Sequence, residues 1–251
     1  NPASIRDLPW AAGDDNPMNG FAEGSQPFGI FRPVHVIVKS ALRVQPFGLY
    51  AWGTKSTVTA ASATLNVRSE LENLSATART FQLVDELVDK DGKVVATVTR
   101  NAELAAGEKV RIDQVFPAIA HPHLWSPTTP DLYTLRARLI ENGQVIDEAE
   151  TPYGIRYLEI ATNADSTRQL MINGQPFFIH GTAEYEHLLG NSHAFSPEQI
   201  RARIGQVKAG GFNAFRDAHY PHNLRYQTIL EQEGLMWWPQ FSAHNWNDNP
   251  A

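Results

Sequence analysis

The sequence predicts a multi-domain protein in which an immunoglobulin-like β-sandwich is followed by an α/β region. Two observations predict this class. From about Ala41 to Thr151 the apolar residues recur with a period of two, as they do in strands with one buried face. From Gln175 to Gln240 short apolar runs alternate with helical patterns, which is typical of parallel strands joined by right-handed crossovers. The second pattern fits either a doubly wound sheet or the opening of a (β/α)₈ barrel.

The composition is that of an ordinary globular protein. Its 251 residues are 42% hydrophobic and 19% charged, and the chain is long enough for two domains. A net charge of −6 and an isoelectric point near 5.8, without a lysine or arginine cluster, argue against a nucleic-acid or membrane partner. The chain has no run of about 18 apolar residues that could span a membrane. It has no cysteine, which excludes disulfides, thiolate metal sites and a cysteine nucleophile.

The first 38 residues have the pattern of the end of a preceding domain. As far as Gln26-Pro27 they are rich in residues that favour turns and loops. Only from Ile30 to Val38 do apolar residues alternate as they do in a strand. In the following sandwich, Asp91-Gly92 and Asn142-Gly143 suit two-residue hairpin turns, because both residues of such turns tolerate positive φ. The period-two pattern predicts a core that includes Leu65, Val67, Leu71, Phe81, Leu83, residues 94–98, Val110, Ile112, Phe116, Leu135, Ala137 and Leu139.

The α/β region opens with a small hairpin turn at Asn173-Gly174. Its strands are expected at 176–179, 213–216 and 235–238.

Two helices are expected between these strands. Ser196-Pro197-Glu198-Gln199 predicts a helix start with a capping box, and Gly210-Gly211 supplies its end. The second helix should begin at the cap Asn223 and stop at Gly234. Its buried face is predicted to contain Leu224, Ile229 and Leu230.

The C-terminal ends of these strands carry the densest group of ionisable and aromatic residues, and chemistry in such folds collects there. Adjacent residues of a strand point to opposite sides, so at most one of Trp237 and Trp238 can face a barrel interior, and the other should pack beneath a helix. The group contains His180, Glu184, Glu186, Arg216, Asp217, His219, Tyr220, Gln240, His244, Phe241 and Trp246.

Five ordered motifs resemble glycoside hydrolase family 2, which includes β-galactosidases, β-glucuronidases and β-mannosidases. The match runs from about Gly29 to Gly234. The motifs are Gly29-Ile30-Phe31-Arg32-Pro33-Val34, Leu124-Trp125-Ser126-Pro127 with Pro130-Asp131-Leu132-Tyr133, Gly154-Ile155-Arg156, Ile172-Asn173-Gly174-Gln175-Pro176, and Asn213-Ala214-Phe215-Arg216 with His219-Tyr220-Pro221.

The resemblance implies three domains. Residues 1–38 would end a jelly-roll sugar-binding domain and contribute its last strand, and residues 39–156 would form the immunoglobulin-like sandwich. Residues 157–251 would hold the first three βα units of the catalytic (β/α)₈ TIM barrel.

The resemblance also implies a retaining glycosidase that cleaves terminal β-galactoside-type linkages in oligo- or polysaccharides. In such enzymes one glutamic acid protonates the leaving oxygen while a second, roughly 5 Å away, attacks the anomeric carbon. In this family these glutamates follow the fourth and seventh barrel strands, so we expect both to lie beyond Ala251 and no catalytic residue within the chain, which alone should be inactive. Two alternatives stay open: a non-catalytic carbohydrate-binding or scaffolding module, or a β-glucuronidase or β-mannosidase specificity.

Several residues are candidate substrate contacts by resemblance. His219 would hydrogen-bond a sugar hydroxyl, and Arg216 would lie against the catalytic carboxylates. The alternatives are a structural histidine and an ion pair to a neighbouring strand. His244 and Asp15 lie near positions where β-galactosidases place further sugar contacts, while Glu184 and Trp238 complete the candidate set. No cofactor and no metal site is expected.

Two departures from the family pattern bear on specificity. The first barrel loop keeps only the first and last residues of the usual motif in Gly181-Thr182-Ala183-Glu184-Tyr185-Glu186, and Gln240 stands where a carboxylate commonly closes the third strand. Because a site built for one hydroxyl pattern rejects another, we expect galactose units of larger or modified polysaccharides rather than lactose. A homo-oligomer of the full-length enzyme is left open, and a periplasmic or secreted bacterial location is slightly favoured over a cytoplasmic one.

Overall fold

The computed structural model describes residues 30, 32–186, 195–218 and 221–240. The chain forms two compact units: residues 36–179 together with 231–234, and the remainder. We describe each unit separately.

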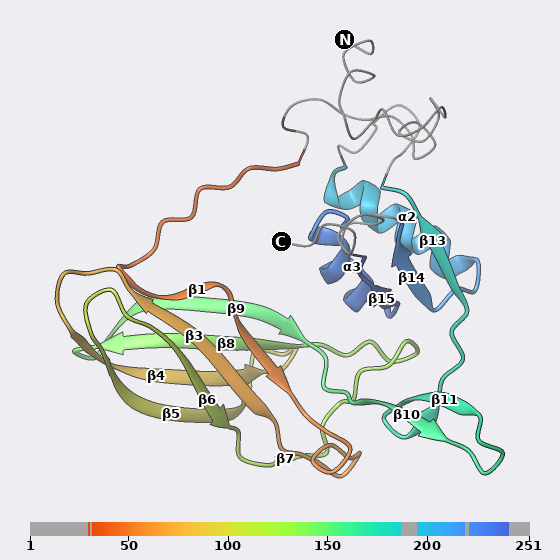
Figure 1. Cartoon of the computed structure of the whole chain (residues 1–251), viewed down its shortest axis with the longest axis horizontal. Coiled ribbons are helices and arrows are strands. Elements are labelled where there is room, and N and C mark those ends of the chain that lie inside the picture. The colour runs from red at the N-terminus through yellow and green to blue at the C-terminus, as the bar shows by residue number, and fades with distance from the viewer. Residues whose placement is uncertain (1–29, 31, 187–194, 219–220, 241–251) are drawn as a thin grey trace, which may run out of the picture. The chain divides into compact units, whose positions relative to one another are not determined.

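The larger unit is a sandwich of antiparallel strands (Figure 1). One sheet has the order β1-β3-β6, with β1 at Leu42–Trp52, β3 at Asn66–Asn73 and β6 at Lys109–Val115. The other has the order β5-β4-β8-β9, with β4 at Arg79–Val88, β5 at Val94–Leu104, β8 at Tyr133–Glu141 and β9 at Gln144–Tyr153. The short strands β2 (Ser62–Ala63) and β7 (Ile119–Ala120) pair with each other.

The sandwich core contains most of the residues that the period-two pattern predicts. Ten of them are buried in one continuous cluster, and Val110 is partly buried against it. In the run 94–98, Ala96 is buried and Val94 is 41% exposed. The alternation is visible in β8, where every second residue from Tyr133 to Leu139 is buried and the residues between are partly exposed. The strands therefore form because each has one apolar face that the opposite sheet covers.

One predicted hairpin turn is confirmed and one is wrong. Asn142 and Gly143 join β8 to β9 with φ values of 52° and 78°, as a two-residue turn requires. The connection from β4 to β5 instead spans residues 89–93. There the Asp89 carboxylate accepts hydrogen bonds from the backbone N–H groups of Asp91 and Lys93, so a side chain organises a longer loop.

A small three-stranded sheet follows the sandwich in the same unit. It has the order β10-β11-β12, with β10 at Leu158–Thr162, β11 at Arg168–Ile172 and β12 at Gln175–Pro176. Asn173 and Gly174, with φ values of 51° and 77°, form the predicted turn between β11 and β12. The predicted domain boundary at residue 157 stays a prediction.

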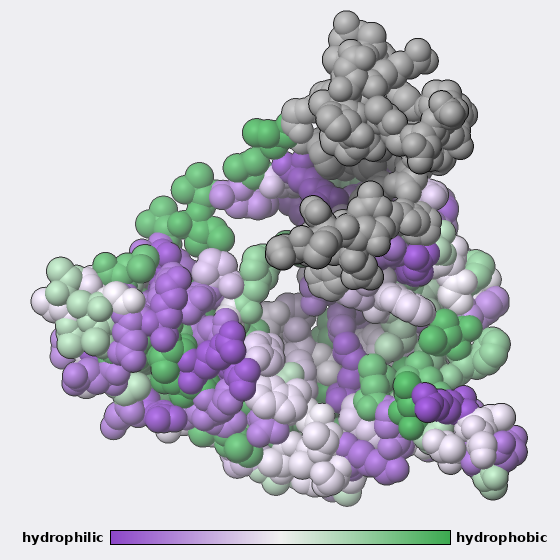
Figure 2. Space-filling view, in the orientation of Figure 1, coloured by the Kyte–Doolittle hydropathy of each residue, from purple (hydrophilic) through white to green (hydrophobic). Residues whose placement is uncertain are grey.

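No strand is found in the described part of the segment from residue 30 to 40, where the alternation predicted one. Val34, Val36 and Val38 are exposed there, and Figure 2 shows the segment as a row of hydrophobic residues. The prediction of a strand is wrong for this structure because alternation alone forms no strand without a hydrogen-bonded neighbour.

The smaller unit has the predicted strand–helix alternation (Figure 1). Its strands β13 (Gly181–Glu184), β14 (Ala214–Asp217) and β15 (Met236–Trp238) are parallel and adjacent in that order. They are joined by the helices α2 (Pro197–Ala209) and α3 (Arg225–Glu233). The apolar faces of both helices pack with Phe215 of β14 in one core.

The first parallel strand is displaced from its predicted position at 176–179. Residues 177–180 form no strand, and Phe178 is 84% exposed. The backbone N–H of Phe177 instead bonds to the carbonyl of Leu170, so this run continues the preceding hairpin. The parallel pairing begins at Gly181, five residues after the predicted start, which puts Glu184 at the last strand position.

The helix ends follow the sequence signals closely. Ser196 and Gln199 form the predicted capping box, and Gly211 and Gly234 have φ values of 83° and 73°. The Asn223 side chain accepts from the N–H of Arg225 at the start of α3. The predicted burial of Leu224 is wrong: it precedes the helix and is 59% exposed, whereas Tyr226, Ile229 and Leu230 form the buried face. Neither α2 nor α3, the helices in the described part of the chain, is long and apolar enough to cross a membrane.

Candidate functional site

The C-terminal ends of β13, β14 and β15 meet at one edge of their sheet because the three strands are parallel. The pairing register places Glu184 beside Asp217, and Arg216 beside Trp238. The prediction that these strand ends gather polar and aromatic side chains is therefore met for Glu184, Asp217, Arg216 and Trp238.

The two sides of this small sheet differ in character. Phe215 and Trp237 share a register position and pack against the helices. Arg216 and Trp238 share the next position and point to the opposite side, because successive side chains alternate. Trp238 is 63% exposed. The expectation that one of the two tryptophans packs beneath a helix is confirmed for Trp237, and Arg216 and Trp238 lie on the side that the two helices do not cover.

Glu184 is held by an ion pair to helix α2. Its two carboxylate oxygens accept from the guanidinium of Arg203 at 2.6 and 2.8 Å. These hydrogen bonds raise the pKa of Arg203 and fix both side chains in a fork geometry. The proposed contact of Glu184 with substrate therefore competes with this ion pair.

Glu186 is fully buried and joins three separate segments. Its Oε2 accepts from Arg32 Nη2 at 2.5 Å, and its Oε1 accepts from the backbone N–H of Asn223 at 2.7 Å. The same Arg32 nitrogen donates to the carbonyl oxygen of Pro221 at 2.7 Å. Burial raises the pKa of Glu186, while the Asn223 N–H and the Arg32 guanidinium lower it.

Asp217, the last residue of β14, is a second buried carboxylate with partners that only donate. Its Oδ1 accepts from the indole Nε1 of Trp237 at 2.8 Å, and its Oδ2 accepts from the backbone N–H of His222 at 3.3 Å. The His222 ring nitrogen Nδ1 lies 3.5 Å from Oδ1. Burial raises the pKa of Asp217 to about 6, against the effect of the two donors.

Glu186 and Asp217 hold the backbone of residues 221–223 from two directions. Each carboxylate uses one oxygen for a backbone N–H of this segment, which makes them positioning residues for the chain that follows β14. His219, His244 and Asp15 lie outside the described residues, and their roles as sugar contacts stay predictions.

The sequence did not indicate this network. Arg32 and Glu186 stand 154 positions apart, so no local pattern relates them. The available signals were weaker: Arg32 belongs to the first family motif, and Glu186 is one of two residues that the first barrel loop shares with the family.

His180 does not follow the first parallel strand, as the sequence analysis expected, but precedes it. Its backbone N–H donates to Asn213 Oδ1 at 2.8 Å, its Nδ1 lies 3.1 Å from the carbonyl oxygen of Gly211, and its ring lies 4.9 Å from that of Phe212. The displaced strand start causes this correction. His180 is thus at the opposite end of the sheet from Glu184.

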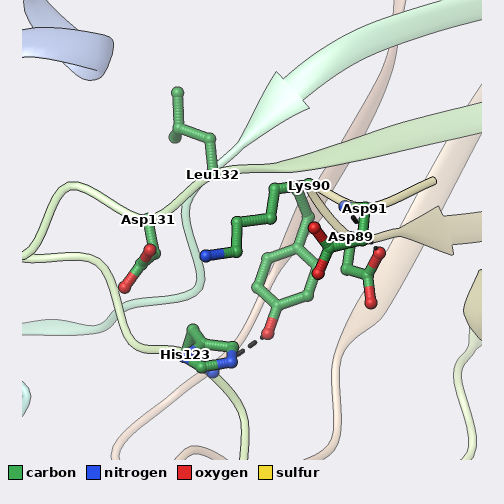
Figure 3. A pocket seen from close by; sticks show the side chains of 7 residues that line it. Asp89, Lys90, Asp91, His123, Asp131 and Leu132 are labelled. Atoms are coloured by element: carbon green, nitrogen blue, oxygen red, sulfur yellow. Dashed lines mark hydrogen bonds between the residues drawn. The ribbon is translucent and has the colours of Figure 1, made fainter. Parts of the chain in front are cut away.

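Among the described residues, no three His, Asp or Glu side chains are arranged to hold a metal ion. A small cavity on the sandwich is lined by acidic side chains together with Lys90 and His123 (Figure 3). Its volume is about 40 Å³, room for little more than one water molecule and too small for a sugar ring. The acid Asp89 in its wall already organises the β4–β5 loop.

Two family models match the chain. "Glycosyl hydrolases family 2" matches residues 50–156, and "Glycosyl hydrolases family 2, TIM barrel domain" matches residues 164–238. Together they cover the sandwich and the parallel strands, so the α/β region is the start of a TIM barrel rather than of a doubly wound sheet.

Similar proteins include glycosidases of two specificities. The beta-galactosidase BoGH2A of Bacteroides ovatus is 27% identical over 87% of this chain and 26% of its own length. A beta-glucuronidase of Bacteroides fragilis is 24% identical over 84% of this chain and 30% of its own length. The crystal structure of a glycosyl hydrolase family 2 member from Bacteroides cellulosilyticus aligns with a TM-score of 0.73 at 26% identity, covering 81% of this chain and 27% of that one. The chain thus spans less than a third of the length of each.

Proposed function

Because the chain belongs to glycoside hydrolase family 2, we propose that it is part of a retaining enzyme that cleaves terminal β-galactoside-type linkages in oligo- or polysaccharides. The observation that carries the proposal is the joint match of the sandwich and the first barrel strands, in order, to this family. The match to a beta-galactosidase along 87% of the chain supports the galactoside preference.

In this proposal the open side of the β13–β15 sheet forms one wall of the sugar site. Arg216 lies against the carboxylates that react, and Trp238 offers an exposed ring face on which the apolar C–H face of a sugar can stack. His219 hydrogen-bonds a sugar hydroxyl. It shortly precedes residues 221–223, whose backbone is held by Glu186 and Asp217.

The reaction needs a general acid and a carboxylate nucleophile about 5 Å apart. The three acidic residues at these strand ends serve other tasks: Glu184 pairs with Arg203, and Glu186 and Asp217 hold the loop. We therefore assign both catalytic glutamates to other barrel strands of the protein, outside these residues.

A β-glucuronidase specificity is the second candidate, favoured by the similarity to a beta-glucuronidase over 84% of the chain. A glucuronide differs from a galactoside by a carboxylate, which requires a cationic partner in the site. Arg216 is the cation on the open side of this sheet among the described residues.

The test is to read the coding sequence beyond Ala251 and to express the longest reading frame that contains this chain. We expect an Asn-Glu pair within about one further βα unit and hydrolysis of an aryl β-galactoside that exceeds hydrolysis of the matching β-glucuronide and β-mannoside. Faster turnover of the glucuronide would replace the proposed specificity. A reading frame without these glutamates, whose product binds sugars without turnover, would instead support a carbohydrate-binding module.

A further inference from the structure

The outer face of the β1-β3-β6 sheet carries two aromatic rings beside a row of planar polar side chains. Tyr50 and Trp52 lie two residues apart on β1 and therefore on the same face. Their cross-strand neighbours on β3 are Arg68 and Asn66, and Arg68 in turn lies beside Asp113 of β6. We call these five residues the aromatic platform.

The platform is ordered by its own contacts. The Tyr50 and Trp52 ring centroids are 5.6 Å apart and their planes are inclined by 33°. The guanidinium carbon of Arg68 lies 5.6 Å from the first centroid and 5.5 Å from the second. Arg68 also binds both carboxylate oxygens of Asp113, at 2.5 and 2.7 Å, and donates to the Tyr50 hydroxyl at 2.8 Å. A ligand would thus meet groups whose rotamers are already fixed.

Hydrogen-bonding capacity remains after these contacts are counted. Arg68 has five N–H groups, and the three bonds above use one on each nitrogen, which leaves two. The Tyr50 hydroxyl accepts from Arg68 and keeps its own proton to donate, and each Asp113 oxygen keeps a lone pair. Arg68 lies against both rings, and Tyr50 and Asp113 are among the exposed residues of the sheet.

The chemistry of the platform fits a neutral, hydroxyl-rich chain. The positive charge of Arg68 is cancelled by Asp113, so the platform has no net charge to attract an anionic polymer. Paired donors and acceptors on planar side chains suit adjacent hydroxyl groups, and the rings suit the apolar C–H face of a sugar. A protein partner would need an apolar interface core. The other side chains along these strands instead form ion pairs from strand to strand: Glu70 with Arg111, and Glu72 with Arg43 and Lys109.

We propose that the aromatic platform is a carbohydrate-binding site of the sandwich, which holds a neutral polysaccharide. The ligand lies across Tyr50 and Trp52 and exchanges hydrogen bonds with Asn66, Arg68 and Asp113. The site belongs to the larger unit and needs none of the strand-end residues. It rests on the proposed function only for the choice of polysaccharides to test.

Affinity electrophoresis of the 251-residue chain tests the proposal. The chain is run in native gels with and without a soluble neutral β-galactan or β-glucan, and with a sulfated galactan as the anionic comparison. We expect the neutral polymers to retard the chain, and Trp52→Ala or Tyr50→Ala to weaken the binding about tenfold. Phe178→Ala is the matched control, since Phe178 is an 84% exposed aromatic residue of the same unit that lies off this face, and it should bind as the wild type does.

A second measurement avoids any folding defect of the variants. The wild-type chain is labelled with fluorotryptophan, the Trp52 resonance is assigned from Trp52→Phe, and the neutral polymer is added. A larger shift of the Trp52 resonance than of the other tryptophan resonances supports binding at the aromatic platform. No retardation by a neutral polymer, retardation unchanged in Trp52→Ala, or binding of the sulfated polymer alone would overturn it. Neither readout involves turnover, so loss of the proposed glycosidase activity leaves this result unaffected, and the reverse also holds.

Discussion

Asp85 in the sandwich and Asp217 at the end of β14 are both fully buried carboxylates, but their hydrogen-bond partners differ in kind. Asp85 accepts from the Ser69 hydroxyl at 2.9 Å and from the Gln114 side-chain amide at 2.8 Å. A hydroxyl can rotate to donate or accept, so this group of three side chains can rearrange. Asp217 accepts from an indole N–H and a backbone N–H, which can only donate.

The difference shows what each of these two carboxylates does. In the sandwich the strands are already held by an apolar core, and the buried aspartate adds no contact to a loop backbone. At the strand ends of the smaller unit, Asp217 and Glu186 hold residues 221–223 in the absence of regular structure there. Burying a carboxylate costs folding free energy. Here the two buried carboxylates fix a loop next to the proposed sugar site.

The largest expected effect concerns the apolar core of the sandwich. Leu135 is completely buried in the central strand β8, so Leu135→Ala should lower the free energy of unfolding by about 2–5 kcal/mol through the cavity it leaves. Urea unfolding measures the loss. Hydrogen exchange followed by mass spectrometry should show faster exchange in peptides of β4 and β8. An equal increase in exchange in β14 would contradict the view that the two regions are stabilised independently.

The pH dependence of Asp85 should be nearly as large. Burial raises its pKa to about 6, above the unfolded value near 3.9, so between these values the folded state binds more protons than the unfolded state. The stability from this residue is fully present below about pH 4 and is lost as the pH rises through about 6, a change of up to about 3 kcal/mol.

Asp85→Asn should remove this loss. Unfolding free energies of wild type and variant, measured from pH 4 to 7, should converge at low pH and differ at pH 7 in favour of the variant. A constant difference across this range would show that Asp85 does not titrate with folding.

The two carboxylates should respond differently to the same substitution. At pH 7, Asp85→Asn can satisfy both partners, because the new amide donates to Ser69 while its oxygen accepts from Gln114. Asp217→Asn relieves a similar buried charge but leaves either Trp237 Nε1 or the His222 N–H without an acceptor, so it should be about 1–3 kcal/mol less favourable than Asp85→Asn. Exchange protection in peptides of β14 and β15 measures the local loss. Equal tolerance at both positions would remove the distinction between the regions.

The smallest expected effects compare two ion pairs. Arg203 binds both oxygens of Glu184, so Arg203→Ala should destabilise α2 by about 0.5–1 kcal/mol, a value reduced by the partial exposure of the pair. Lys55 makes a single contact with Glu159 at 3.0 Å from an exposed position, and Lys55→Ala should leave thermal unfolding unchanged. A larger loss for Lys55→Ala than for Arg203→Ala would contradict the ranking.

The sequence predicted the fold well where one local rule acts alone. Period two identified the sandwich core, and the capping box located the start of α2. The rule failed where a distant or side-chain contact overrides it, as when Asp89 reorganises the β4–β5 loop or when the apolar run at 176–179 continues a hairpin.

The candidate site was predictable only in part for the same reason. Strand alternation predicted that one of Trp237 and Trp238 packs beneath a helix, and only the structure shows that it is Trp237. The contacts of Glu186 with Arg32 and Asn223 join segments that no periodicity relates. Such a network follows from tertiary packing, which single-sequence patterns do not encode.

The most direct test of the sugar site uses His219→Ala and Arg216→Ala in the protein expressed from the extended reading frame. Both kcat/KM per folded molecule and the melting temperature are measured on the same preparation. Loss of one hydrogen bond to a sugar hydroxyl in the transition state should lower kcat/KM for His219→Ala roughly 5- to 150-fold, with a nearly unchanged melting temperature. Arg216→Ala should lower kcat/KM at least as much, because it removes a charge beside the reacting carboxylates. A depressed melting temperature with unchanged kcat/KM in both variants would contradict the account and make these strand ends purely structural.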